Sequence, residues 1–208
     1  MDSFDSGWRN ASQTAFALQL ARNKEEVGNP PEHWSFCARQ IDDLRQSGNH
    51  VERMVDIGCG AGGLYAVANT LGIKYIGYDY APAAIDIATN YWGADSFFVK
   101  DYKDLTPDDI NDDDIIVANA LCDVLPNGDE CFESLLNLNA KQLLILRVKL
   151  SYGETSSYEE YVAYNEIKTY AYRHNSRTLD GMIQKYSYDA IIGAYIASED
   201  IVNIRLTK

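Results

Sequence analysis

The chain has 208 residues, of which 46% are hydrophobic and 24% are charged, a composition typical of one folded domain rather than a disordered segment. With 31 acidic and 18 basic residues the formal net charge is −13, which disfavours nucleic acid as a partner. No apolar run approaches the roughly 20 residues that span a bilayer, and residues 1–6 carry acid where a targeting peptide carries base. We therefore expect a cytoplasmic protein with no membrane segment.

The cysteines and the acid-rich stretches do not have the spacing of metal ligands. The four cysteines form no Cys-x-x-Cys pair, and the acids between Asp108 and Asp113 suit a solvated loop. We expect neither a disulfide nor a metal site, and we interpret the cysteines as small buried residues. The sequence leaves the oligomeric state open.

The spacing of apolar residues predicts helices and strands that alternate along the chain. Glycine and proline end the first predicted helix, and Pro82 begins a later one. Helices are expected around residues 11–27, 34–41, 64–71, 82–92, 132–136 and 179–186, and strands at 54–57, 74–78, 96–99, 115–117 and 142–148.

This alternation predicts an α/β fold. Five strands that alternate with helices favour a doubly wound parallel sheet with helices on both faces. The tail departs from the pattern, because two β-rich runs, Tyr188–Ala197 and Ile201–Leu206, are separated only by Ser198–Asp200. So short a connection predicts an antiparallel C-terminal hairpin.

A glycine-rich loop follows the first predicted strand. Gly58, Gly60 and Gly63 match G-x-G-x-x-G, and Gly62 also completes G-x-G-x-G. Such glycines permit a tight turn and let a ligand approach the backbone closely. Taken alone, the loop suggests a nicotinamide dinucleotide site.

Two acids near the loop favour a different ligand. Asp56 precedes the first glycine by two residues, where a carboxylate repels a pyrophosphate and attracts an ammonium group. Asp79 lies at the end of the second strand, where an acid can accept hydrogen bonds from both hydroxyls of a ribose. S-adenosyl-L-methionine has a ribose, a cationic amino-acid portion and no phosphate, and it satisfies both conditions.

Four segments resemble the motifs of class I S-adenosylmethionine-dependent methyltransferases. Residues 55–63 (Val-Asp-Ile-Gly-Cys-Gly-Ala-Gly-Gly) resemble the first motif, and residues 75–79 the second. Residues 97–101 are similar to the strand-then-acid near the adenine amino group, and residues 114–119, continuing to Leu125-Pro126, to the fourth motif beside the transferring methyl. The resemblance implies a seven-stranded sheet of order 3-2-1-4-5-7-6, with the seventh strand antiparallel.

The resemblance also implies a set of cofactor-binding residues. Asp56 has an alternative role as an acid that only bonds the loop amides, Asp101 as a helix cap, Cys59 as a packing residue, and Asn119 as a residue that bonds its own loop. Val124 stands where many small-molecule members of the family have a histidine, so catalytic help must come from elsewhere. The implied cofactor-binding residues are Asp56, Gly58, Cys59, Gly60, Gly62, Asp79, Tyr80, Asp101, Tyr102 and Asn119.

The segment between Val148 and His174 is rich in tyrosine, and Ser157 and Glu160 have the spacing of a helix capping box. Because this connection follows the fifth strand, we expect it to cover the acceptor at the carboxyl edge of the sheet. Tyr161 and His174 are our candidate catalytic residues, with His174 as proton acceptor. The alternative for His174 is a surface residue that precedes a helix cap, and the alternative for any single tyrosine, Tyr161 included, is an amphipathic residue that half-covers an ordinary helix.

These observations predict a single methyltransferase domain over residues 1–208. Its parts are N-terminal helices that form a lid (1–50), a cofactor-binding core (51–148) and an acceptor-side cover with the terminal hairpin (149–208). The predicted function is S-adenosylmethionine-dependent methyl transfer to a hydroxyl or amine of a small molecule. The alternatives are a methyltransferase for protein or a capped RNA end, a nicotinamide-dependent oxidoreductase, and a non-catalytic cofactor-binding protein.

Overall fold

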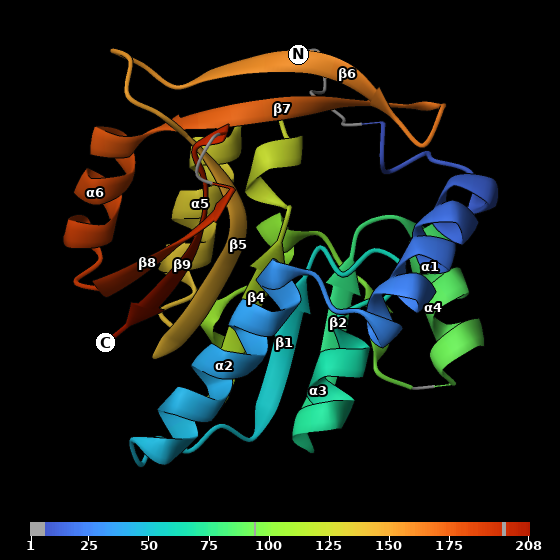
Figure 1. Cartoon of the computed structure of the whole chain (residues 1–208), viewed down its shortest axis with the longest axis horizontal. Helices are drawn as coiled ribbons and strands as arrows, with labels where there is room; N and C mark the ends of the chain where they lie inside the picture. The colour runs from blue at the N-terminus through green and yellow to red at the C-terminus, as the bar shows by residue number, and fades with distance from the viewer. Residues whose placement is uncertain (1–6, 94, 197–198) are drawn as a thin grey trace.

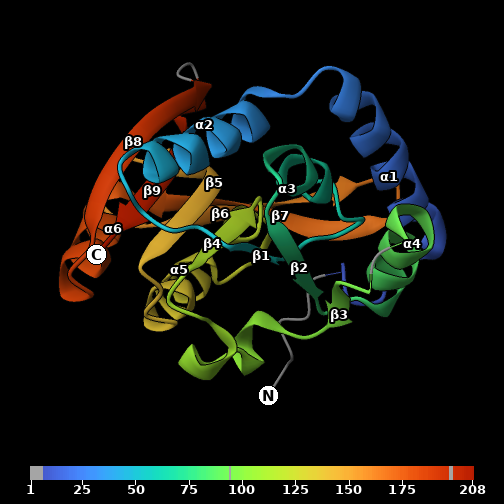
Figure 2. The same cartoon turned by 90° about the horizontal axis from the view of Figure 1, so that it is seen from below.

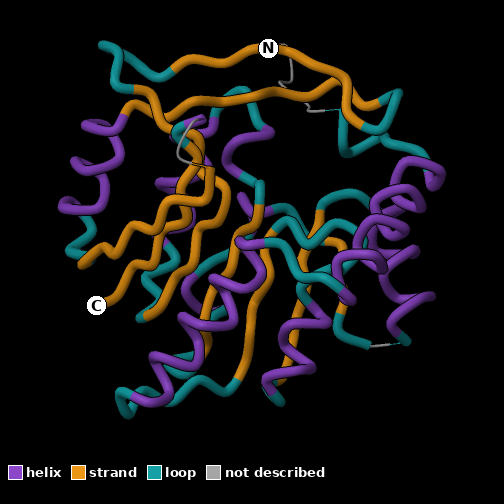
Figure 3. Tube along the Cα trace, in the orientation of Figure 1, coloured by secondary structure: helices purple, strands orange, loops and turns teal. Residues whose placement is uncertain are grey.

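A computed structural model describes residues 7–93, 95–196 and 199–208 of the chain. The acidic residues 1–6 and the hairpin positions Ala197 and Ser198 lie outside the described residues. The described part forms a nine-stranded sheet with helices on both faces (Figures 1 and 3). Within this part, no helix has the length and apolar character needed to cross a membrane.

The elements follow one another in the predicted alternating order. The helices are α1 (Gln13–Gly28), α2 (Glu32–Gln46), α3 (Tyr65–Leu71), α4 (Pro82–Trp92), α5 (Gly128–Asn137) and α6 (Ser176–Lys185). The strands are β1 (Arg53–Ile57), β2 (Lys74–Asp79), β3 (Phe97–Val99), β4 (Asp114–Asn119), β5 (Gln142–Ser151), β6 (Ser157–Ala163), β7 (Ile167–Asn175), β8 (Asp189–Ile196) and β9 (Ile201–Thr207). Short 3-10 helices include η1 (Tyr102–Asp104) and η3 (Cys122–Val124).

The parallel half of the sheet has the order β3-β2-β1-β4-β5. Its central strands are apolar on both faces, as expected where helices cover both sides. Met54 of β1 packs with α2, α3 and α4, while the adjacent Val55 packs with α5 and α6 on the other face. Viewed from below, α2 and α3 lie on one side of the sheet and α5 on the other (Figure 2).

The C-terminal half confirms the predicted antiparallel hairpin. β9 pairs antiparallel with β5, and β8 pairs antiparallel with β9. The resulting order is β3-β2-β1-β4-β5-β9-β8. It equals the expected order 3-2-1-4-5-7-6 when the additional strands β6 and β7 are left out of the count, so that β8 and β9 become the sixth and seventh strands. The predicted fold class is therefore confirmed, with nine strands in the described residues instead of seven.

The helix predicted from the capping-box spacing of Ser157 and Glu160 is wrong. Both residues lie in β6, which pairs antiparallel with β7. Tyr164 and Asn165 at the turn have φ values of 48° and 65°, and the N–H of Glu166 donates to the carbonyl of Ala163. Positive φ at both central residues is typical of a type I′ hairpin turn, and tyrosine, valine and threonine favour strands. These preferences outweigh the capping-box signal.

The β6–β7 hairpin crosses over the carboxyl ends of the central strands (Figure 1). The N-terminal segment holds its tip in place. The N–H of Gly7 donates to the carbonyl of Lys168, and Trp8 Nε1 donates to Thr169 Oγ1 at 2.8 Å. Ser12 N donates to Glu166 Oε1 at 2.9 Å. The N-terminal segment and the β6–β7 hairpin, which are far apart in the sequence, are therefore hydrogen-bonded to each other at the carboxyl edge of the sheet.

Candidate functional site

A cavity of about 360 Å³ lies at the carboxyl edge of the sheet. Its floor comes from the loops after β1, β2 and β4 and from β5; α1, α2 and the β6–β7 hairpin supply the rest of its wall. Of the residues predicted from the sequence, the cavity wall includes Asp56, Gly58, Cys59, Gly60, Asp79, Tyr80, Asn119 and Tyr161.

The glycine loop is built around left-handed backbone. Gly58, Gly60 and Gly62 have φ values of 76°, 52° and 76°. A Cβ at Gly60 would lie 2.5 Å from Oε1 of Gln19. A side chain at this position would therefore strain the backbone, because φ is positive, and would also clash with the Gln19 side chain. Gln19 Oε1 accepts a hydrogen bond from the N–H of Ala61 at 2.9 Å. Helix α1 and the loop therefore form one wall of the cavity.

Asp79 fixes the geometry of this loop. Its Oδ2 accepts a hydrogen bond from the N–H of Gly60, and its Oδ1 from the N–H of Ala81, both at 2.9 Å. Burial raises the pKa of Asp79 to about 6, although these backbone hydrogen bonds oppose the shift. The carboxyl group lies in the cavity wall at the end of β2, as the ribose-binding hypothesis requires.

Asp56 lies in the wall of the same cavity, and one of its carboxylate oxygens has no hydrogen-bond partner among the described residues. Tyr75 donates its hydroxyl to Asp56 Oδ2 at 2.7 Å, whereas Oδ1 is buried and has no hydrogen-bond partner among the described residues. Burial raises the pKa of Asp56 to about 7; the Tyr75 hydrogen bond lowers it, and the charge of Asp79 raises it. A cationic group in the cavity would satisfy the orphaned oxygen.

A second cavity of about 70 Å³ adjoins the first and shares Gly58, Asp79 and Tyr80 with it. Its wall also includes Asp101 and Tyr102. The carboxylate of Asp101 accepts a hydrogen bond from Lys103 N at 3.1 Å, which caps η1, and forms an ion pair with Arg9 at 2.6 Å. The cap, an alternative that the sequence left open, is thus present, and the carboxylate also borders the cavity.

Cys59 and Asn119 lie in the wall of the larger cavity. The Cys59 thiol is buried, and its Sγ lies 3.7 Å from the carbonyl oxygen of Gly60. Asn119 Oδ1 is buried and has no hydrogen-bond partner in the described part of the chain, so this oxygen does not bond its own loop. Gly62 is absent from both cavity walls and shapes the turn behind them.

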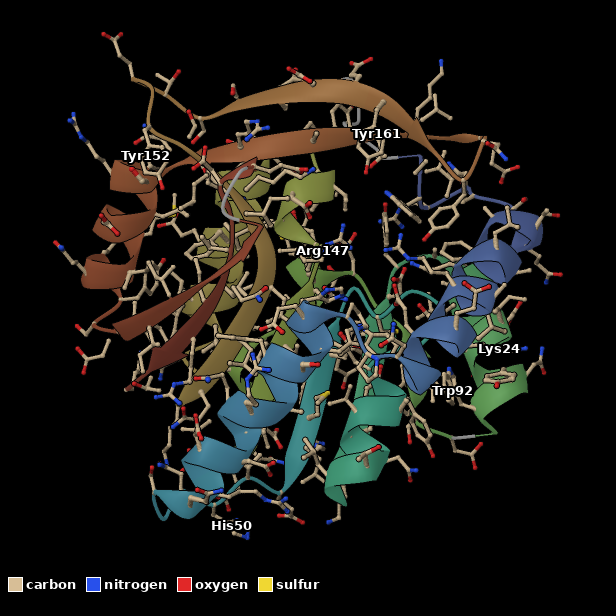
Figure 4. All side chains as sticks on the ribbon, in the orientation of Figure 1. Lys24, His50, Trp92, Arg147, Tyr152 and Tyr161 are labelled. Atoms are coloured by element: carbon tan, nitrogen blue, oxygen red, sulfur yellow. The ribbon has the colours of Figure 1, made fainter. Side chains whose placement is uncertain are left out.

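The two candidate catalytic residues have different positions. Tyr161 on β6 lines the cavity, and Figure 4 shows it on the hairpin above the sheet edge. His174 lies on β7, is fully buried, and pairs through Nδ1 with Asp129 Oδ1 at 2.7 Å. Because it is absent from the cavity wall, the structure does not bring it to Tyr161. The alternative of a surface position for His174 is wrong, because its exposed fraction is 0%.

Several cavity residues were missed by the sequence analysis: Gln19, Arg22, Asn23, His33 and Arg147. Asn23 is a buried polar residue on the same helix face as Phe16 and Leu20, and polar residues within an apolar stripe are a usable signal. Arg147 interrupts the apolar run of β5, which is a second such signal. Burial, with the charges of Arg147 and Arg22, lowers the pKa of His33 to about 3.

Comparison with solved structures supports the fold. Magnesium protoporphyrin IX methyltransferase from Synechocystis PCC 6803, crystallised with SAM, matches 85% of this chain and 79% of its own at 14% identity and a TM-score of 0.59. An S-adenosylmethionine-dependent methyltransferase from Clostridium acetobutylicum matches 92% and 98% at 10% identity and a TM-score of 0.63. A sugar N-methyltransferase from Streptoalloteichus matches 85% and 86% at 7% identity and a TM-score of 0.60.

Sequence comparison assigns the family. A search of curated protein sequences gave no significant match. The methyltransferase domain family, however, matches residues 32–191, which cover most of the chain and include the glycine loop, both buried acids and the hairpin. This match argues against the oxidoreductase alternative. With the glycine loop and the fold in agreement, the chain belongs to the methyltransferase domain family.

Proposed function

We propose that the protein transfers a methyl group from S-adenosyl-L-methionine to a hydroxyl or amine of a small molecule. The observation that carries the proposal is the pair of buried acids beside the glycine loop. Asp56 lies in the wall of the larger cavity and has one buried oxygen without a hydrogen-bond partner among the described residues, and Asp79 bonds the loop at the end of β2. An ammonium group suits the first carboxylate, and ribose hydroxyls suit the second.

Different parts of the cofactor would occupy the two adjoining cavities. Asp56 and Asp79 would hold its amino-acid and ribose portions, and Tyr80, Asp101 and Tyr102 border the smaller cavity that suits the adenine. When bound, this cofactor supplies a methyl group on a sulfonium. Alignment of the acceptor and exclusion of water then account for most of the rate in an in-line displacement.

Tyr161 and His33, two side chains of the cavity wall outside the cofactor-binding set, are poor bases near neutral pH. Burial raises the pKa of Tyr161, so its hydroxyl stays protonated near neutral pH and donates hydrogen bonds. His33 stays neutral near pH 7 because its pKa is lowered to about 3 by burial. This environment favours a mechanism in which the protein positions an acceptor rather than deprotonates it.

The shape of the site supports a small acceptor. Cavities of roughly 300–1,000 Å³ are typical of small-molecule sites, and this one lies beneath the hairpin and the N-terminal segment. Both the amino-acid portion of the cofactor and the acceptor must fit there. We propose that these two segments cover the acceptor during the reaction.

Two measurements test the proposal. Calorimetry should detect binding of S-adenosylmethionine and of its demethylated product, and no binding of nicotinamide dinucleotides. Incubation with methyl-labelled S-adenosylmethionine should then transfer label to a protein-free metabolite extract, and not to a protein or RNA fraction. Label in the protein or RNA fraction alone would contradict the small-molecule acceptor, and tight dinucleotide binding would contradict the cofactor.

A further inference from the structure

Arg147 has an unusual backbone position. It lies in β5, where the pairing with β9 shifts register between Ile145 and Val148. Its φ is 63°, in the left-handed region that residues with a Cβ seldom adopt. The N–H of Arg147 donates to Asn203 Oδ1 at 3.0 Å, a side chain that holds the distorted strand. Bulges of this kind redirect a side chain, and strained backbone gathers at functional sites.

The bulge separates Arg147 from the core. Ile145 and Val148 pack in the same apolar cluster although they lie three residues apart, which is possible only because the strand is irregular between them. Leu146 packs in the cluster on the opposite face. Arg147 belongs to neither apolar cluster, and it lines the larger cavity at the carboxyl edge of the sheet (Figure 4).

The guanidinium of Arg147 forms no ion pair or hydrogen bond with the side chain of any described residue. Burial raises the pKa of Asp123, and the charges of Arg147 and of Lys149, which lies 3.6 Å from its carboxylate, lower that pKa. Four of the other eight arginines form ion pairs with acids: Arg9 with Asp101, Arg22 with Glu26, Arg39 with Glu32 and Arg53 with Asp114. Arg147 thus lines the cavity with a guanidinium whose N–H donors bond no described side chain, while the charge of Asp123 acts on it from outside the cavity wall.

Arg147 lies on the acceptor side of the site. Asn119 pairs with Leu146 in the β4–β5 register, and the N–H of Ala120 donates to the carbonyl of Leu146 at 3.2 Å. Arg147 is therefore beside the end of β4, whereas Asp56 and Asp79 lie on β1 and β2, the strands on the other side of β4. The charge is positive at this end of the cavity and acidic at the other.

We propose that Arg147 binds an oxyanion group, a carboxylate or a phosphate, of the methyl acceptor, so that the substrate is an anionic small molecule. This inference rests on the proposed function. A guanidinium presents paired N–H donors that match such a group with two parallel hydrogen bonds. The carboxylate of the cofactor is a second source of the same chemistry, and the experiment separates the two.

The test uses three ring compounds that differ in charge: benzoate, phenyl phosphate and benzamide. Each is titrated by calorimetry into the full chain, with and without saturating S-adenosylhomocysteine. We expect at least one anion to bind about tenfold or more tightly than benzamide, the scale of hydrogen bonds to a charged group. The preferred anion tells carboxylate from phosphate. Equal binding of all three, or no binding of any at millimolar concentration, overturns the proposal.

Variants assign the preference to the residue. Arg147→Gln should abolish it, and Arg147→Lys should retain part of it because the charge remains. Arg177→Gln is the matched control, because Arg177 is exposed on α6 and absent from the cavity wall. Thermal melting confirms that each variant is folded. A preference that survives in Arg147→Gln, or disappears in Arg177→Gln, overturns the proposal.

Cofactor affinity separates the remaining interpretations. Arg147→Gln should bind S-adenosylhomocysteine within about twofold of the parent protein. A loss of tenfold or more would assign Arg147 to the cofactor carboxylate and overturn the acceptor role. If the parent itself fails to bind S-adenosylmethionine and S-adenosylhomocysteine, the proposed function fails, while the titrations without cofactor still measure the anion preference of Arg147.

Discussion

The two ends of the cavity are built in different ways. At the ends of β1 and β2, a local loop is tied to Asp79 through two backbone N–H groups, and Asp56 is held by the Tyr75 hydroxyl, all within a short stretch of sequence. At the ends of β4 and β5, the wall comes from Arg147 and from the β6–β7 hairpin, to which Trp8 bonds from near the start of the chain. In the proposed function, the first end holds the cofactor and the second holds the methyl acceptor.

The strongest way to break the cofactor end is Gly60→Val. The φ of 52° and the 2.5 Å approach of a Cβ to the Gln19 side chain oppose any side chain at this position. We expect cofactor affinity to fall by more than about a hundredfold, because the loop must move. Calorimetry with S-adenosylhomocysteine measures it. Gly28→Val is the control, since a Cβ there meets nothing within 4 Å; similar losses in both variants would contradict the prediction.

His174→Ala tests whether the hairpin base is structural. The ring is fully buried and pairs with Asp129, so its removal should lower the free energy of unfolding by about 2–4 kcal/mol. Turnover per folded molecule should change little, because His174 does not line the cavity. Urea unfolding and an acceptor assay measure the two quantities. Lost turnover with stability preserved would place His174 at the chemistry after all.

Asp79→Ala tests the contribution of a single side chain to cofactor binding. It removes the acceptor of two backbone hydrogen bonds and the proposed ribose contact, so cofactor binding should weaken by about 1.5–3 kcal/mol. Asp108→Ala, outside both cavity walls, should leave binding unchanged. Unaltered affinity in Asp79→Ala would show that the acid serves only the loop.

The pH dependence of cofactor binding tests the role of the acids at the cofactor end of the cavity. With its pKa raised to about 7, Asp56 is largely neutral at pH 5.5 and ionised at pH 7.5. Only the ionised form attracts an ammonium, so cofactor affinity should rise with pH, by about five- to twentyfold over this window if binding lowers the pKa by one to two units. Asp79, with a pKa of about 6, acts in the same direction. Asp56→Asn should show a smaller rise, and an unchanged one would exclude Asp56 as the titrating group.

The smallest effect is expected at the hairpin. Tyr161→Phe removes a hydroxyl from the cavity wall, so the acceptor KM should rise about three- to tenfold at saturating cofactor. Tyr152→Phe is the matched control, because Tyr152 is 70% exposed and lies outside the cavity wall. Loss of kcat with KM unchanged would instead make Tyr161 a catalytic residue.

The predictability of each end follows from the range of the interactions that build it. Asp56, Gly60 and Asp79 lie in strand-loop patterns whose geometry is local, so their positions were predictable. The hairpin was misassigned, because Ser157 and Glu160 fit a capping box and the competing strand pairing is a property of two segments together. Arg147 carries no motif, and its orientation depends on a bulge fixed by Asn203, 56 residues later.

The position of β9 has a consequence for how the molecule folds. Residues 201–207 insert between β5 and β8, so the ladder along β5 is completed by the last strand in sequence order. Until these residues join, β5 has an open edge that can pair with other chains. Pairing of such distant segments is slow, and partly folded chains with open edges tend to aggregate. Truncations that remove β9 should therefore reduce the soluble yield before they affect the preformed glycine loop.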